Sequence, residues 1–300
     1  MGILGLTIQR TNGIPIVTKT WTDKLSGFTQ IDSMLTAGFM SAITSFADSF
    51  DQNIDFIQIS PKKEPDSNGI SVVLNYFSDV MMICFTEPYL FLDKVTMKLR
   101  WIYENLIQTK LDDLDAVCNV FTITPEEEMY IEDILFDKVA RILIEERKEQ
   151  IISVLEDLEN HFAQEEIRGF SINSFDNSII FTYHIDEQEL ENLLCNMGKG
   201  GYVKDWEVQY KPVWIEKNPV LVSYTNSAVK IQISDIIMKE KAADQEEGQL
   251  YFGVVPLYYY IITDTDCSIG PIMEKINTSL HPIFVDYKID ASKLDFELEI

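Results

Sequence analysis

The chain opens with two short apolar segments joined by a tight turn, and this pattern constrains the fold more than any other local feature. Residues 3–10 (ILGLTIQR) and 14–21 (IPIVTKTW) alternate apolar with smaller or polar side chains, as β-strands do. Asn12-Gly13 between them is a residue pair that hairpin turns favour, because both residues tolerate a positive φ. The sequence therefore predicts an antiparallel hairpin as the beginning of a sheet.

A helix and three further strands are expected to follow. Residues 32–50 have apolar side chains three or four positions apart, and the small residues Gly38 and Ala42 predict a close approach to a sheet. The expected buried face of this helix holds Leu35, Phe39, Ala42, Phe46 and Phe50. Residues 88–108 predict a second helix that begins at Pro88. Three apolar segments between the helices predict strands, at residues 54–60, 70–77 and 80–86.

The resulting order β-β-α-β-β-β-α predicts an α+β domain with a five-stranded antiparallel sheet, and it resembles the longin domains. Two segments carry the resemblance: the hairpin ILGLTIQRTNGIPIVTKTW and the helix LTAGFMSAITSFADSF, which is similar to archaeal longin-like proteins. The resemblance extends to the end of the second helix. It implies a profilin-like layering, with one helix after the second strand and one or two after the fifth. Longin domains lack a catalytic signature and bind small GTPases, coat subunits or membrane-fusion proteins.

The rest of the chain divides into a helical segment and a second α+β region. In residues 123–165, Thr124-Pro125-Glu126-Glu127 has the features of a helix start, and apolar residues recur at helical spacing up to Phe162. This connector, one long helix or two stacked ones, joins a first domain (1–122) to a second (166–300). The second domain repeats the order of two strands, a helix, several strands and a helix. We interpret it as another longin-like domain that departs from the pattern by an extra strand near residues 219–234, a short first helix and a β-rich tail in place of a further helix. A different α+β domain is the alternative.

The net charge of −25 limits the partners that the chain can bind. All three regions are negative, so no basic face for a nucleic-acid backbone is expected, and attraction to anionic lipid is disfavoured. No run of about 18 apolar residues occurs, so no integral membrane segment is expected, and peripheral membrane contact would come through a partner. The four cysteines are scattered without a CxxC pair, which fits a reducing, cytoplasmic compartment.

No catalytic, cofactor or metal site is expected. The histidines His161, His184 and His281 lie in different predicted elements without metal-ligand spacing. No nucleotide-binding or nucleophile motif occurs. The competing pattern is Asp264 and Asp266 at the end of the strand YYYIITDTD, where two carboxylates can hold a divalent metal, as in glycosyltransferase-like enzymes. The alternative is that these acids end the strand and cap the next helix.

The sequence thus predicts a non-catalytic protein-binding module. The resemblance implies a small-GTPase regulator or a subunit of a trafficking-type complex, with a small GTPase or another longin-domain protein as partner. The alternatives are a structural adaptor without a GTPase partner, and a metal-dependent enzyme using Asp264 and Asp266. Binding is expected at sheet edges, because an edge strand can pair with another chain. The residues expected there are Ile16, Thr18 and Thr20 on one edge, and Phe56 and Gln58 on the other.

Overall fold

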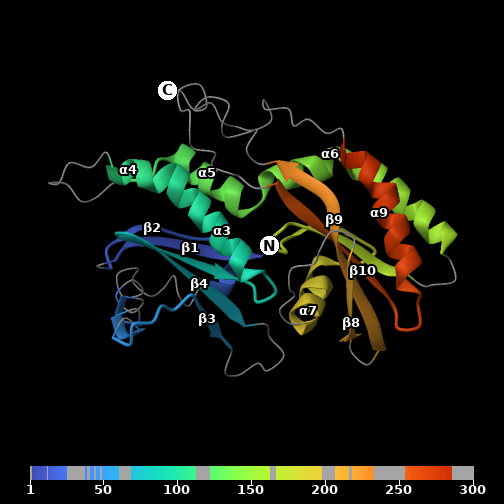
Figure 1. Ribbon diagram of the computed structural model, residues 1–300, viewed down its shortest axis with the longest axis horizontal. Helices are drawn as coiled ribbons and strands as arrows, with labels where there is room; N and C mark the ends of the chain where they lie inside the picture. The colour runs from blue at the N-terminus through green and yellow to red at the C-terminus, as the bar shows by residue number, and fades with distance from the viewer. Residues whose placement is uncertain are drawn as a thin grey trace. The chain divides into compact units, whose positions relative to one another are not determined.

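The computed structural model of the 300-residue chain forms two compact units, Met1–Phe136 and Asp137–Ile300 (Figure 1). The structure describes residues 2–11, 13–25, 38, 41–43, 45–47, 49–60, 69–112, 122–162, 167–197, 207–215, 218–232 and 254–285. Each unit is a five-stranded antiparallel sheet with helices, so the predicted α+β class with a repeated sheet is confirmed. None of the helices in these ranges is both long enough and apolar enough to cross a membrane.

The sheet of unit 1 has the strand order β2-β1-β5-β4-β3. Its strands are β1 (Ile3–Arg10), β2 (Pro15–Thr20), β3 (Phe56–Ile59), β4 (Ile70–Phe77) and β5 (Val80–Thr86). Every residue of β5 is buried, as is expected of a central strand that is covered on both faces. β2 and β3 lie at the two edges, which confirms the placement that the element order predicts.

The described part of the helix predicted at residues 32–50 lies on one face of this sheet. The described residues 38, 41–43 and 45–47 are helical. The amide of Gln9 in β1 donates a hydrogen bond to the hydroxyl of Ser41 at 3.4 Å, and Ala47 is buried. This side of the helix therefore faces the sheet.

The predicted buried face of that helix is wrong. Ala42, Phe46 and Phe50 are exposed, and so is Gly38, where an added Cβ would meet nothing within 4 Å. The small residue at the contact is Ala47, one position beyond the aromatic stripe that the periodicity favoured. Leu35 and Phe39, the other members of the predicted face, lie outside the described residues.

Helix α3 (Leu92–Ile102) covers the opposite face of the same sheet. It continues through a π-helical turn, η2 (Tyr103–Ile107), into α4 (Gln108–Asp112). The side-chain amide of Asn75 in β4 donates to the carbonyl of Thr96 at 3.4 Å, and the rings of Phe77 and Tyr103 stack with centroids 4.2 Å apart. These contacts join the sheet to the helix predicted at residues 88–108.

Residues 123–165 form two helices that belong to different units. Helix α5 (Pro125–Leu135) is part of unit 1, and α6 (Lys138–His161) is part of unit 2. The break falls at Asp137, whose φ of 53° leaves the right-handed helical region. The boundary between the units therefore lies within the segment expected to connect domains 1–122 and 166–300.

The sheet of unit 2 has the order β7-β6-β10-β9-β8. Its strands are β6 (Ile167–Asn173), β7 (Ile179–Tyr183), β8 (Val208–Ile215), β9 (Asn218–Gln232) and β10 (Val254–Asp264). The extra strand expected near residues 219–234 does not exist as a separate element, because that region is the single 15-residue strand β9. A register shift between Pro256 and Tyr258 accommodates its length against β10. The β-rich tail expected after the last helix lies outside the described residues.

The two units arrange their elements in the same spatial order. In each, one helix lies on one face of the sheet and two lie on the other. In unit 2, α7 (Glu187–Met197) is the single helix, and α9 (Ile269–Val285) and α6 lie on the opposite face (Figure 1). In unit 1 the helix beside an edge strand is α5, which comes after the strands along the chain. In unit 2 it is α6, which comes before them.

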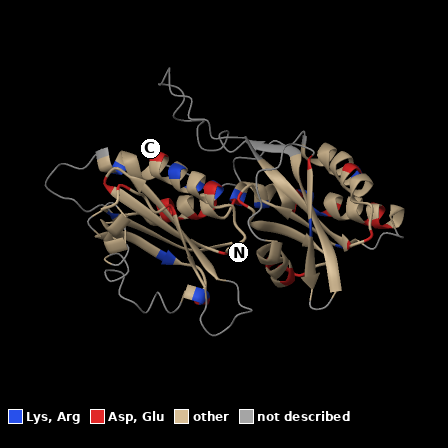
Figure 2. Cartoon of the chain, turned by 60° about the horizontal axis from the view of Figure 1, so that its bottom comes forward, with Lys and Arg blue, Asp and Glu red and all other residues tan. Residues whose placement is uncertain are grey.

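Charged side chains lie mainly on the helices and turns, and the strands are largely uncharged (Figure 2).

Candidate protein-binding surfaces

The backbone of β3 points outward at the residues that the sequence predicts for partner binding. The amide of Leu74 donates to the carbonyl of Asp55 at 2.9 Å, and these residues lie opposite each other in the β3–β4 register. Bonded and non-bonded pairs alternate along an antiparallel ladder. Ile57 is therefore bonded to β4, whereas the N–H and C=O groups of Phe56 and Gln58 point away from it. No strand within the described ranges pairs with this outer side.

The side chains of β3 leave the same edge accessible. Phe56 is 48% exposed, and Gln58 is also exposed. Ile57 and Ile59 point to the other face, where they pack against a cluster that includes Val72. β3 contains no charged residue and no proline, the residues with which edge strands commonly avoid pairing with other chains. The outward N–H and C=O groups of Gln58 therefore lie on a side of β3 that no strand within the described ranges covers.

Thr18 and Thr20 have the equivalent backbone orientation on the other edge. The amide of Trp21 donates to the carbonyl of Leu4 at 3.0 Å, so the alternation leaves Thr18 and Thr20 with outward N–H and C=O groups. Thr18 is exposed, while Ile16 and Thr20 are half-buried. Three strands separate β2 from β3, a distance of about 19 Å. The two predicted sets of residues therefore do not form one site.

Exposed aromatic side chains mark two further surfaces. The first helix was expected to take part in docking beside a sheet edge, but with Phe46 and Phe50 buried, and the surface on β8 was not predicted. On the first helix, Phe46 and Phe50 are 67% and 62% exposed, and their rings meet edge to face with centroids 5.1 Å apart. On the edge strand β8, Tyr210 and Trp214 are 67% and 63% exposed. Large aromatic side chains that are exposed in the unbound protein are often buried at the centre of a protein interface.

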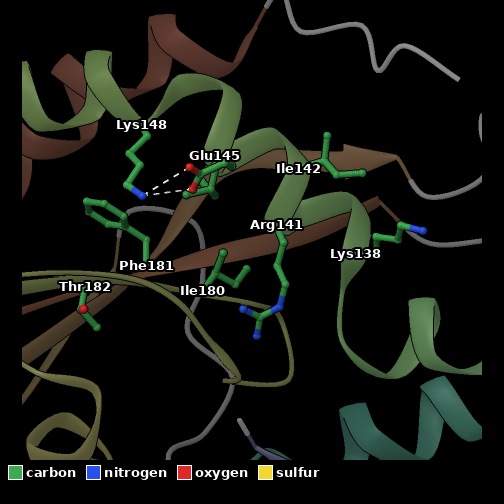
Figure 3. Close-up of a pocket in the computed structure, with 9 residues that line it drawn as sticks. Lys138, Arg141, Ile142, Glu145, Lys148, Ile180, Phe181 and Thr182 are labelled. Carbon is green, nitrogen blue, oxygen red and sulfur yellow. Dashed lines mark hydrogen bonds and ion pairs between the residues drawn. The ribbon is translucent and has the colours of Figure 1, made fainter. Parts of the chain in front are cut away.

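A groove of about 520 Å³ lies in unit 2 between α6 and the edge strand β7 (Figure 3). Lys138, Arg141 and Lys148 line it from α6. The guanidinium of Arg141 donates to the carbonyl of Ile179 at 3.0 Å, and Lys148 contacts Glu145 at 3.2 Å. This groove was not predicted from the sequence. The spacing of Lys138, Arg141 and Lys148 along α6 places three cations on one helix face, which is unusual in so acidic a chain and could have indicated it.

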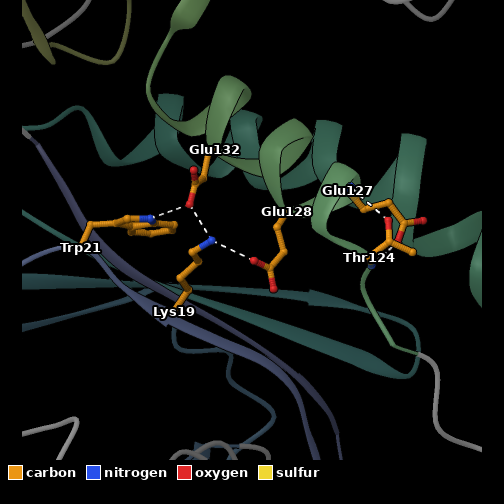
Figure 4. A network of polar contacts seen from close by, with 6 residues as sticks. All are labelled: Lys19, Trp21, Thr124, Glu127, Glu128 and Glu132. Atoms are coloured by element: carbon orange, nitrogen blue, oxygen red, sulfur yellow. Dashed lines mark hydrogen bonds and ion pairs between the residues drawn. The ribbon is translucent and has the colours of Figure 1, made fainter. Parts of the chain in front are cut away.

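In unit 1 the corresponding contact between helix and edge strand is a polar network (Figure 4). The ammonium of Lys19 in β2 lies 2.7 Å from the carboxylate of Glu132 and 2.9 Å from that of Glu128, both on α5. The indole of Trp21 donates to Glu132 at 2.9 Å. The hydrogen bonds from Glu132 and Glu128 raise the pKa of Lys19 above its ordinary value. The network fastens α5 to the edge strand β2.

The start of α5 is fixed by the capping box that the sequence predicts. The hydroxyl of Thr124 accepts a hydrogen bond from the amide of Glu127 at 3.3 Å, and the carboxylate of Glu127 accepts one from the amide of Thr124 at 2.7 Å. Lys110 of α4 adds an ion pair with Glu127 at 2.8 Å. These contacts set where α5 begins, and hence which of its acids reach Lys19.

The carboxylates considered for a metal site are arranged differently from a metal-binding pair. Asp264 forms an ion pair with Arg168 at 2.5 Å, and Asp266 lies exposed in the turn that follows β10. Within the described part of the chain, no three His, Cys, Asp or Glu side chains are grouped closely enough to hold a metal ion. This geometry gives the enzyme alternative no support.

Comparison with known proteins adds no family assignment. No protein-family model matches the chain, and no curated protein matches it in sequence.

Proposed function

We propose that the chain is a non-catalytic protein-binding module and that β3 of unit 1 is its main docking edge. The observation that carries the proposal is the outward N–H and C=O groups of the exposed residue Gln58, on a strand without protective charges. An extended segment of a partner would add a sixth strand there, using these backbone groups for affinity and the Phe56 side chain for an apolar contact. Phe46 and Phe50 provide a second apolar surface in the same unit.

The resemblance of the first unit to longin domains supports a more specific proposal about the partner. Under it, the partner is a small GTPase or another longin-domain protein, and the chain is a regulator or subunit in a trafficking-type assembly. The scattered cysteines, without a CxxC pair, support a cytoplasmic location. A structural adaptor without a GTPase partner would use the same edge, so the two proposals differ in the partner and not in the surface.

The test begins with affinity purification from the native cell, followed by affinity measurements on the purified partner. Gln58→Pro removes an outward N–H, and Phe56→Ser removes the exposed ring. Each is expected to weaken binding by about tenfold or more, as at an interface residue that contributes 1.4 kcal/mol. Thr18→Pro on the opposite edge is the matched control and is expected to leave binding unchanged.

Two outcomes would decide against parts of the proposal. If folded Gln58→Pro and Phe56→Ser proteins bind the partner as tightly as the parent, β3 is not the docking edge. If the partner is a GTPase, its affinity should depend on whether it carries GDP or GTP. A partner that is neither a GTPase nor a longin-domain protein would favour the adaptor.

A further inference from the structure

The groove between α6 and β7 has the charge and shape to hold an extended acidic segment. Lys138, Arg141 and Lys148 occupy one face of α6, and Glu145 is the single carboxylate among the lining residues. This local excess of positive charge stands in a chain whose net charge is −25. An anionic ligand is therefore attracted to this groove more strongly than to the surrounding acidic surface.

The groove also has an apolar component, which restricts the kind of anion that fits. Ile142 and Ile180 line it half-buried, and Ile144 and Phe181 form buried parts of its wall. One side of the groove is the edge strand β7, and an extended peptide is the form of chain that lies along such an edge. The expected ligand thus combines carboxylates with apolar side chains in an extended segment.

Residues 294–300 of this chain have that pattern. Their sequence, LDFELEI, alternates apolar residues with acids over its whole length. In an extended conformation the apolar side chains lie on one face and the acids Asp295, Glu297 and Glu299 on the other. This segment lies outside the described residues. We propose that residues 294–300 dock in the groove of their own chain, with their carboxylates toward Lys138, Arg141 and Lys148.

A short stretch of chain joins the segment to α9, and α9 packs against α6, the helix that lines the groove. Helix α9 packs against α6 and runs in roughly the opposite direction, so the C-terminal end of α9 is the end nearer to the beginning of α6 (Figure 1). Residues 286–293 separate α9 from the proposed docking segment, and in extended form they span up to about 28 Å. A short tether of this kind raises the effective concentration of the segment to about the millimolar range, so individually weak contacts suffice.

Zero-length crosslinking of the full chain tests the proposal directly. A carbodiimide joins a lysine amine to a carboxylate only where the two are in contact, and mass spectrometry identifies the joined residues. We expect links from Asp295, Glu297 or Glu299 to Lys138 or Lys148, alongside the Lys148–Glu145 link that the ion pair provides. Lys275, exposed on α9, is the matched control lysine and is expected to give no link to this segment.

A mixture of isotopically labelled and unlabelled chains shows whether the segment in the groove belongs to the same chain or to a second copy. Links within one chain support the proposal. Links that form only between labelled and unlabelled chains show that a second copy supplies the segment, and would overturn it. Links that join the segment to Lys275 as often as to Lys148, or no links to the segment at all, would also overturn it.

Hydrogen exchange provides a second measurement that needs no crosslinker. Docking should protect the amides of β7, residues 179–183. In the variant Asp295→Asn/Glu297→Gln/Glu299→Gln their exchange should accelerate by about tenfold, the combined effect expected of three exposed ion pairs. Lys138→Glu/Lys148→Glu should have the same effect, and Lys275→Glu should have none. Unchanged exchange in both multiple variants would contradict the proposal.

Discussion

The ammonium of Lys98 donates a hydrogen bond to the backbone carbonyl of Leu135 at 2.9 Å. Lys98 lies in the middle of α3 and is completely buried, and Leu135 is the last residue of α5. A cation at the end of a helix satisfies a carbonyl that has no partner within the helix and interacts favourably with the helix dipole. One side chain thus joins the two helices that cover the same face of the sheet.

Lys98→Met is therefore expected to destabilise unit 1. Methionine keeps most of the side-chain volume but leaves a buried carbonyl without its donor, a loss of about 1–3 kcal/mol in the free energy of unfolding. Urea denaturation of the full chain measures this difference. Lys94→Met, in the same helix at a partly exposed position, is the matched control and is expected to change stability by less than about 0.5 kcal/mol. Equal effects of the two substitutions would show that the hydrogen bond to Leu135 does not matter.

The network around Glu132 predicts a pH dependence of stability. Burial alone would raise the pKa of Glu132, but hydrogen bonds from Lys19 and Trp21 outweigh it and place the pKa below the ordinary value of 4.5. A carboxylate with a lowered pKa in the folded state stabilises the fold above the pKa of the unfolded chain, and this stabilisation is lost as the pH falls through the folded-state pKa. Glu132→Gln should therefore be less stable than the parent near neutral pH.

The difference between parent and Glu132→Gln should shrink as the pH falls below 4.5, because the carboxylate then binds a proton more readily in the unfolded chain than in the folded one. It reaches its minimum once the pH is below the folded-state pKa and the carboxyl is neutral in both states. Urea denaturation at a series of pH values measures it. A difference that stays constant down to acidic pH would mean that the charge of Glu132 does not contribute, and that only its shape or its bond to Trp21 matters.

Gly38→Ala is expected to stabilise unit 1. Gly38 is helical and exposed, and an added Cβ would meet no atom within 4 Å, so the change removes backbone freedom from the unfolded chain without a clash. The expected gain is about 0.5–1 kcal/mol. Gly69→Ala provides the contrast, because its Cβ would come within 2.4 Å of the Ile59 carbonyl oxygen. If Gly38→Ala lowers the melting temperature, the helix has its other face toward the sheet.

The contrast between edge strands and first helix shows what the sequence can predict. The order of strands along the chain, with tight turns between β1 and β2 and between β4 and β5, predicts both edges of the first sheet. The buried face of the first helix was not predictable in this way, because apolar residues occupy two neighbouring stripes. Periodicity favours the stripe with the larger side chains. The close contact with the sheet instead selects the small residue Ala47 and leaves Phe46 exposed.

Contacts between distant parts of the chain account for the other features of the structure that the sequence did not predict. Lys19 and Glu132 are separated by most of unit 1 in sequence, and no local pattern indicates that they meet. Likewise, the apolar spacing in residues 123–165 predicts helix without showing where it breaks, whereas the structure ends α5 at Leu135 and begins α6 at Lys138, in different units. The sequence predicts an extra strand near residues 219–234, whereas pairing with β10 keeps this region one continuous strand.

The alternation of hydrogen bonds along β3 predicts opposite effects of proline at adjacent residues. At Gln58 the N–H points outward, so Gln58→Pro removes no ladder hydrogen bond and should change the free energy of unfolding by less than about 1 kcal/mol. At Ile57 the N–H is bonded to Val72 in β4, and Ile57→Pro should cost about 3 kcal/mol or more. Urea denaturation of the two variants is independent of any partner. If Gln58→Pro is the more destabilising, the register assigns the outward groups to the wrong residues, and a partner strand would have to pair through Ile57 instead.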